Sequence, residues 1–200
     1  KDKYVEPIFF MLLASSLLAG CTIISKILGG NLLGEKLNAF QISHSRFFFA
    51  FIVILILSHF LKLRLKKPKV KFHFYRAFCG WVGVSILFGV SSIIPVSDAL
   101  AINFMFPVFA VMIAIPILNE KINLYGFILI IISFLGAIIL IRPTFDLLEF
   151  KIISLISLFG ALILGIESIF IKLLSQNEKS IQILFINNFF GLLLSSIPVY

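Results

Sequence analysis

The fold is decided by the stretch from Pro95 to Pro143, which reads PVSDALAINFMFPVFAVMIAIPILNEKINLYGFILIIISFLGAIILIRP. It contains two apolar runs, Val96–Leu118 and Leu124–Ile141, separated by a polar turn around Asn119-Glu120-Lys121. Each run has about the 20 residues that a helix needs to cross the hydrocarbon core of a bilayer. The stretch therefore predicts two membrane-spanning helices joined as a hairpin.

The rest of the chain has the same character, since 60% of its 200 residues are hydrophobic and 13% are charged. Its mean hydropathy is +1.14, whereas soluble domains are far more polar. Apolar runs give seven candidate spans: Ile8–Leu28, Ala39–Leu61, Phe74–Ile94, Val96–Leu118, Leu124–Ile141, Ile152–Leu174 and Ile181–Tyr200. We therefore predict an all-α polytopic membrane protein. The chain starts without methionine and stops inside an apolar run, so we expect a fragment of a longer protein.

Basic residues are unevenly distributed over the connections between these spans. Twelve of the seventeen fall at the N-terminus or after the second, fourth and sixth spans: Lys1, Lys3, Lys62, Arg64, Lys66, Lys67, Lys69, Lys71, Arg76, Lys121, Lys172 and Lys179. Four fall on the opposite side: Lys26, Lys36, Arg142 and Lys151. The positive-inside rule then predicts a multi-pass protein of the inner (plasma) membrane with a cytoplasmic N-terminus. We expect the basic loop after the second span to attract anionic lipid headgroups, and we predict no nucleic-acid partner.

The sequence lacks the motifs of metal, cofactor and nucleotide chemistry. Cys21 and Cys79 lie in apolar runs without the spacing of a metal or redox site. His44, His59 and His73 are scattered, and Walker, Rossmann and HExxH patterns are absent. We predict no metal, no cofactor and no catalytic residues.

Two parts of the chain show a weak internal similarity. When Asn38–Phe51 is set over Lys179–Leu193, Gln41-Ile42 falls on Gln182-Ile183 and Phe48-Phe49-Ala50 on Phe189-Phe190-Gly191. Spans one and two would then match spans six and seven, so that each repeat has five helices and the second copy is inverted in the membrane. We expect residues 1–146 to form the first repeat and 147–200 to begin the second. Chance similarity between two Phe/Leu-rich helices is the alternative.

An ordered set of motifs resembles the EamA-type members of the drug/metabolite transporter superfamily. The set is Arg46-Phe47, Tyr75-Arg76-Ala77, Gly80, Pro95-Val96-Ser97-Asp98-Ala99, Pro107, Glu120, Gly126, Gly136 and Arg142-Pro143. The resemblance implies about ten helices in two five-helix repeats, of which this chain holds seven. It also implies a cavity lined by spans one, three, four and six with later helices. Asp98 before Ala99 is similar to members labelled S-adenosylmethionine-uptake-like.

Three charged residues in or near the spans are candidates for substrate binding. Glu167 lies midway along span six without an adjacent cation, so it requires a buried partner or a water-filled cavity. Arg46 should face protein or water rather than lipid, although it could also snorkel to the interface. Asp98 has a structural explanation, because a helix N-terminus stabilises a carboxylate. Its functional alternative is proton coupling.

Polar and small residues complete the candidate lining. Asn103, Trp81 and Ser85 are predicted to line the cavity, although Asn103 could instead form an interhelical hydrogen bond and Trp81 could pack. Ser16 and Gly20, and likewise Ala161 and Gly165, are small-residue pairs that predict close helix contacts.

We therefore expect a secondary-active transporter that moves a small polar metabolite by alternating access and is not an enzyme. The energy would come from a proton or exchange gradient, or from the substrate gradient alone. A membrane-embedded enzyme is the alternative, and it would need two carboxylates, a metal-binding His cluster or a Ser/His pair brought together. A membrane scaffold without a polar cavity is a further alternative.

Overall fold

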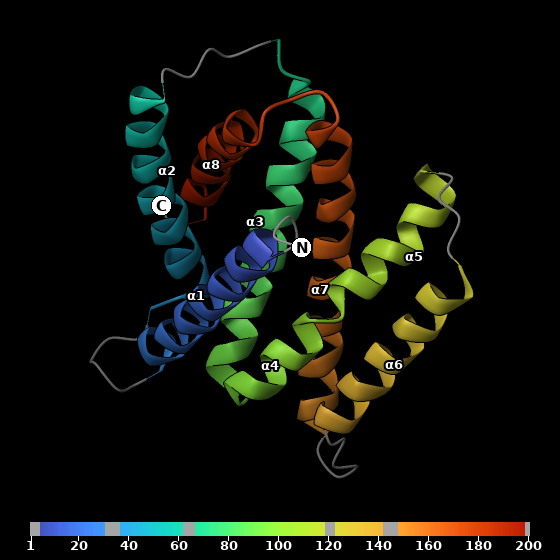
Figure 1. Ribbon diagram of the computed structural model, residues 1–200. Coiled ribbons are helices and arrows are strands. Elements are labelled where there is room, and N and C mark those ends of the chain that lie inside the picture. The colour runs from blue at the N-terminus through green and yellow to red at the C-terminus, as the bar shows by residue number, and fades with distance from the viewer. Residues whose placement is uncertain (1–4, 31–36, 62–66, 119–122, 142–147, 199–200) are drawn as a thin grey trace.

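The computed structural model describes residues 5–30, 37–61, 67–118, 123–141 and 148–198, and every regular element in them is an α-helix (Figure 1). The helices are α1 Val5–Gly29, α2 Ala39–Phe60, α3 Val70–Ile93, α4 Val96–Asn103, α5 Phe106–Leu118, α6 Leu124–Ile141, α7 Leu148–Ser175 and α8 Ser180–Ser196. The predicted turn around Glu120 lies outside the described residues.

The predicted all-α membrane fold is confirmed by the length and composition of these helices. Five described stretches are long and apolar enough to cross a bilayer: Ile8–Gly29, Ala39–Phe60, Val70–Ile93, Val96–Leu118 and Ile152–Ser175. Leu124–Gly136 and Ser180–Ser196 are shorter apolar helices. Large apolar side chains are exposed along α1, α2 and α6, as expected of helices that face lipid or further helices.

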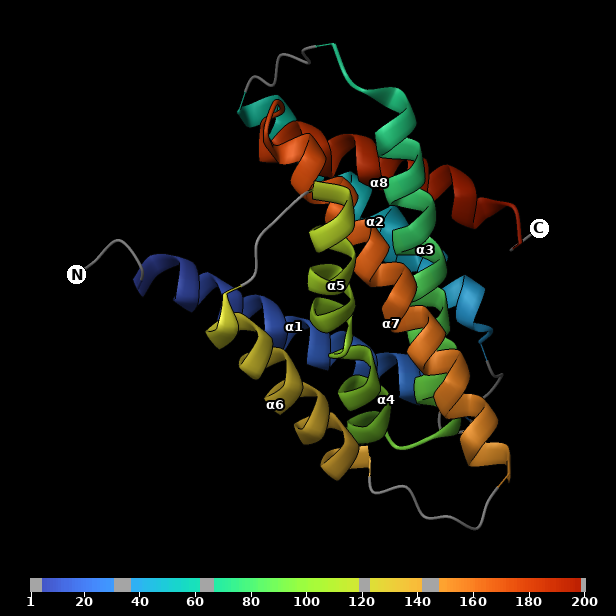
Figure 2. The same ribbon diagram turned by 90° about the vertical axis from the view of Figure 1, so that its right-hand side faces the viewer.

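α3 and α7 pack side by side in the middle of the bundle (Figures 1 and 2). Glycines allow this approach on both helices. A Cβ atom on Gly83 would lie 2.6 Å from the side chain of Leu164, and one on Gly160 would lie 2.7 Å from that of Ile86. Any larger side chain would push the two helices apart, which is the usual role of small residues at membrane helix interfaces.

The fourth predicted span is two helices rather than one. α4 ends at Asn103 and α5 begins at Phe106, so the helix is interrupted over two residues. Pro107 explains this break, because proline has no N–H to donate to the carbonyl of Asn103. Proline also disfavours the helical conformation in the residue that precedes it.

The break packs against small residues of α7. Met105 joins Ala161 in a buried apolar cluster. A Cβ atom on Gly165 would lie 2.8 Å from Cβ of Phe109. The pair Ala161 and Gly165 is therefore a close helix contact. Gly20 is not, since a Cβ atom there would meet nothing within 4 Å among the described residues.

α2 and α8 pack along each other in opposite directions. Nδ1 of His44 lies 3.0 Å from Oγ of Ser195, and further along α2 the ring of Phe51 lies 5.7 Å from that of Phe185. Residue numbers thus rise along α2 while they fall along α8, which shows the antiparallel arrangement.

α1 is joined to α3 through its C-terminal half. The hydroxyl oxygens of Ser25 and Ser91 are 3.1 Å apart, and Nζ of Lys26 donates a hydrogen bond to the carbonyl of Ile94 at 2.8 Å. The N-terminal half of α1 extends away from α3 and α7 (Figure 2). Polar contacts between α1 and α3 are thus concentrated at one end of the bundle.

Lys69, just before α3, and the turn between α7 and α8 lie together at the other end. Glu178, in the turn between α7 and α8, accepts a hydrogen bond of 3.1 Å from the backbone N–H of Lys69 just before α3. This agrees with the alternation of loops that the sequence predicts. Which of the two ends faces the cytoplasm stays a prediction.

Candidate functional site

Glu167 lies in the interior of α7 and directs its carboxylate at α3. Its two carboxylate oxygens would lie 2.9 and 3.1 Å from a Cβ atom placed on Gly80. Real Cβ atoms are hardly ever this close to another heavy atom, so the carboxylate occupies space that only glycine leaves free. The absence of a side chain at Gly80 therefore allows the carboxylate of Glu167 to contact α3.

Arg76 provides a counter-charge that the sequence analysis did not identify. Its Nη2 atom lies 3.9 Å from Oε1 of Glu167, and the side chains are 8% and 17% exposed. The prediction began this span at Phe74, near Arg76, whereas α3 begins at Val70 and so places the arginine further inside the helix. The sequence does indicate that Arg76 and Gly80 share a helix face, because they are four residues apart.

The pair leaves part of the guanidinium of Arg76 without a partner. Its Nε and Nη1 atoms are buried and donate no hydrogen bond within the described ranges. A guanidinium carries five N–H donors, and buried charges in proteins are normally paired and hydrogen-bonded. The single long contact with Glu167 therefore uses only some of the N–H donors of Arg76.

Arg46 is a second cation that attracts the carboxylate of Glu167, but beyond the distance of an ion pair. It lies on α2, where it is exposed, and its guanidinium carbon is 5.6 Å from the ring centre of Phe47. We call Arg46, Arg76 and Glu167 the charge cluster. With every group ionised it carries two positive charges and one negative charge.

Trp81 and Ser85 lie on α3 beside this cluster, four residues apart and so on one helix face. The ring of Trp81 is 6.0 Å from that of Phe40 on α2. Its Nε1 atom and Oγ of Ser85 are buried without a hydrogen-bond partner in the part of the chain that is described. Neither atom forms a hydrogen bond with Glu167 there, so the role of the two residues in binding stays a prediction.

Asn103 and Asp98 lie on α4. Asn103 is buried at the last residue of this helix, directly before the break. Asp98 is in the first turn, where its Oδ1 accepts a hydrogen bond of 3.1 Å from Oγ of Ser97. This position fits the structural explanation of Asp98. Asp98 forms no ion pair with the charge cluster among the described residues.

A second polar group surrounds Glu178 at the end of the bundle. Oε2 of Glu178 lies 2.9 Å from Nε2 of His73 and accepts a hydrogen bond of 2.6 Å from Gln182. Burial acts to raise the pKa of Glu178. Hydrogen bonds from Lys69, His73 and Gln182 outweigh it and hold the pKa below its usual value. This group joins α3 to the α7–α8 turn.

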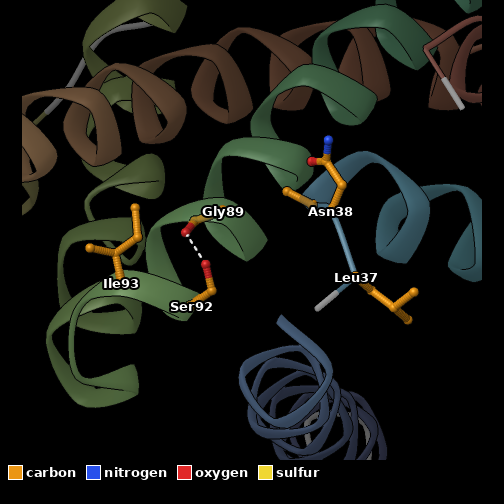
Figure 3. Close-up of a pocket in the computed structure, with 6 residues that line it drawn as sticks. Leu37, Asn38, Gly89, Ser92 and Ile93 are labelled. Atoms are coloured by element: carbon orange, nitrogen blue, oxygen red, sulfur yellow. Dashed lines mark hydrogen bonds between the residues drawn. The ribbon is translucent and has the colours of Figure 1, made fainter. Parts of the chain in front are cut away.

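A pocket of about 400 Å³ opens elsewhere, between the start of α2 and the end of α3 (Figure 3). It is lined by Leu37, Asn38, Ala39, Gly89, Ser92 and Ile93. It contains no charged side chain, and Oγ of Ser92 is already bonded to the carbonyl of Gly89 at 2.7 Å. We therefore place the candidate functional site at the charge cluster. Within the described ranges, no three His, Cys, Asp or Glu side chains are grouped to hold a metal.

Comparison with known proteins points to membrane transport. The sequence model of the EamA-like transporter family matches residues 6–142, which include Arg46, Arg76 and Gly80. Glu167 lies beyond the matched part. No solved structure matches the chain.

Curated relatives carry one shared name. The S-adenosylmethionine uptake transporters of Rickettsia prowazekii and Rickettsia bellii are 30% identical over 118 residues and 32% identical over 112 residues. Each match covers 56% of this chain and 38% of the relative. That of Rickettsia conorii is 29% identical over 147 residues, 70% of this chain and 46% of the relative. The chain thus spans less than half the length of these relatives.

Proposed function

Because the chain belongs to the EamA-like transporter family, we propose that it carries a small polar metabolite across a membrane as a secondary transporter working by alternating access. One observation carries this proposal. Glu167 and Arg76 form a largely buried ion pair between two apolar helices, where charged groups are costly and mark substrate or ion pathways. A packing role alone would not require this arrangement.

The chemistry of the cluster supports a metabolite that bears both signs of charge. The relatives are named for S-adenosylmethionine, which has a sulfonium, an ammonium and a carboxylate group. Glu167 is suited to the cationic groups of such a ligand and the arginines to its carboxylate. Asn103, Trp81, Ser85 and Asp98 are further candidates for the lining. We infer an S-adenosyl compound or a similarly charged metabolite as the substrate.

The mechanism that we propose uses an inverted repeat. Residues 1–146 would form the first repeat and 147–200 would begin the second, with the site between them near the middle of the membrane. The antiparallel packing of α2 against α8 supports this relationship, because these are the helices that the weak sequence repeat pairs. We place the N-terminus in the cytoplasm and the protein in the inner membrane. Glu167 is the residue that could couple transport to a proton.

Uptake into proteoliposomes tests the function. Protein reconstituted with unlabelled S-adenosylmethionine inside should accumulate external labelled compound faster than protein-free liposomes, as expected for exchange by alternating access. Chromatography of the vesicle contents should recover the compound unchanged. Chemical conversion would favour a membrane-embedded enzyme, and uptake equal to that of protein-free liposomes would reject the proposed substrate.

A further inference from the structure

We propose that Glu167 pairs with Arg76 only while no ligand is bound, and that the carboxylate of a zwitterionic ligand displaces it from Arg76. The cationic end of the ligand then becomes the partner of Glu167. This inference rests on the proposed function and deepens it. It states the class of substrate, an amino-acid-like zwitterion, and the residue that receives the carboxylate of that substrate.

The contact between Arg76 and Glu167 is a poor match for a guanidinium, which is the first step. Oε1 of Glu167 lies 3.9 Å from Nη2 of Arg76, whereas a charge-assisted hydrogen bond is about 2.7–2.9 Å long. Both oxygens of the carboxylate lie against Gly80, at 2.9 and 3.1 Å from the position of a Cβ atom. Glu167 therefore holds Arg76 by charge, without the two parallel hydrogen bonds that a carboxylate can accept from a guanidinium.

The unused donors of Arg76 are the second step. The side chain of Arg76 is 8% exposed, and its Nε and Nη1 atoms are buried and donate no hydrogen bond within the described ranges. Buried donors that stay unpaired carry a desolvation cost. A ligand carboxylate that accepts two hydrogen bonds from the guanidinium would remove part of this cost. Arg76 should therefore bind such a carboxylate in preference to Glu167 in its present position.

The balance of charge is the third step. Arg76 and Glu167 are neutral as a pair, and Arg46 lies beyond ion-pair distance of Glu167 and is outside this balance. A zwitterion adds one charge of each sign, so a carboxylate at Arg76 and a cation at Glu167 leave neither residue unpaired. A ligand with a cation alone would bring a surplus positive charge between apolar helices, and one with a carboxylate alone a surplus negative charge. The pair therefore favours a zwitterion.

The two residues also lie on opposite sides of the boundary between the proposed repeats. Arg76 is on α3, in residues 1–146, and Glu167 is on α7, in residues 147–200, and these two helices pack side by side. A ligand that separates the ion pair would remove one of the contacts between them. Alternating access requires the repeats to move against each other, and this movement would expose the donors of Arg76 to the ligand.

Probes that differ in single charged groups can test the exchange. Methionine is the zwitterion, 3-(methylthio)propylamine lacks its carboxylate, and 4-(methylthio)butanoate lacks its ammonium group. S-adenosylmethionine and its decarboxylated counterpart form a second comparison. Isothermal titration calorimetry of the purified protein measures the affinity of each probe. We expect methionine and S-adenosylmethionine to bind about tenfold or more tightly than their decarboxylated counterparts, as charge-assisted hydrogen bonds predict.

Glu167→Gln distinguishes displacement from a fixed structural pair. The amide carries no charge and no longer competes for Arg76, so 4-(methylthio)butanoate should bind about tenfold or more tightly than to the wild type. The cation 3-(methylthio)propylamine should bind more weakly. The double variant Arg76→Gln, Glu167→Gln keeps the pair neutral and should bind the carboxylated and decarboxylated probes alike. Lys67→Gln, a change at an exposed cation outside the helices, should bind every probe like the wild type.

Three results would overturn the inference. One is equal affinity of the wild type for the two members of each comparison, or no binding of any carboxylated probe. Another is binding of 4-(methylthio)butanoate to Glu167→Gln that is unchanged or weaker, because a purely structural ion pair predicts no gain. The third is a preference for the carboxylate that survives in the double variant, which would assign this group to another residue.

The outcomes also separate this inference from the proposed function. If the wild type shows no preference for the carboxylate while uptake of S-adenosylmethionine persists, the inference fails and the transporter proposal stands. If the methionine series gives the expected pattern and S-adenosylmethionine does not bind, the exchange at Arg76 is supported and the S-adenosyl substrate is rejected.

Discussion

The carboxylate of Glu167 lies against the bare Cα of Gly80, within 3.1 Å of where a Cβ atom would be. This contact brings an acid of α7 to the face of α3 that also carries Arg76, although the two helices are separated by more than fifty residues of sequence. A side chain at position 80 would fit only if the carboxylate of Glu167 moved.

Gly80→Ala should therefore damage the site more than the fold. The added methyl group would displace the carboxylate, which is the end of a flexible side chain and can move at little cost in stability. We expect the transport rate to fall clearly, whereas the Tm of the protein in detergent should change little. Gly136→Ala is the matched control, because a Cβ atom there meets nothing within 4 Å in the described structure. Equal transport by both variants would show that the contact is unimportant.

The hydrogen bonds around Glu178 predict a dependence of stability on acid pH. Its pKa in the folded protein is lowered, so its contribution is present above the pKa of the unfolded state, about 4.3, and is lost as pH falls through the folded pKa. Thermal unfolding of the purified protein should show Tm falling from pH 5 to pH 3. Glu178→Gln should reduce this fall and lower Tm at pH 7. An unchanged pH profile in the variant would contradict the assignment.

The predicted orientation can be tested by cysteine labelling of intact cells. In a Cys21→Ser, Cys79→Ser background, Lys36→Cys should react with a membrane-impermeant maleimide added outside. Lys67→Cys should react only after the cells are permeabilised, because the positive-inside rule places the basic loop in the cytoplasm. Labelling of Lys67→Cys alone in intact cells would reverse the topology.

The inverted repeat predicts a specific relation that the full-length protein can test. In an experimental structure, α1 should superpose on α7 and α2 on α8 by a rotation about an axis in the membrane plane. A best fit about the membrane normal, or none, would reject the repeat and leave the similarity of α2 and α8 to chance.

The sequence predicted helices well where hydropathy decides them. The run Leu124–Ile141 coincides with α6, and α2 begins at the predicted Ala39. The division of the fourth span into α4 and α5 was not predicted, because hydropathy values do not register that Pro107 lacks an N–H. A local rule for proline predicts where a helix can break, and tertiary contacts decide whether it does.

The site was harder to predict for a physical reason. Glu167 was found because an acid inside an apolar run is costly, and that is a local property. Arg76 was missed because its importance depends on the packing of α3 against α7. That packing is set by Gly80, Gly83 and Gly160 together, and no one of these positions shows which helix will be its partner.

The most direct test of the central claim is uptake by Glu167→Gln across a range of external pH. The amide keeps the size and removes the charge, so we expect insertion in the membrane as in the wild type and uptake lower by about tenfold or more, as loss of a charge-assisted interaction predicts. The control is Glu178→Gln, an equivalent change outside the spanning helices. Its uptake, normalised to the amount of folded protein, should equal that of the wild type. Wild-type uptake by Glu167→Gln at every pH would contradict the account.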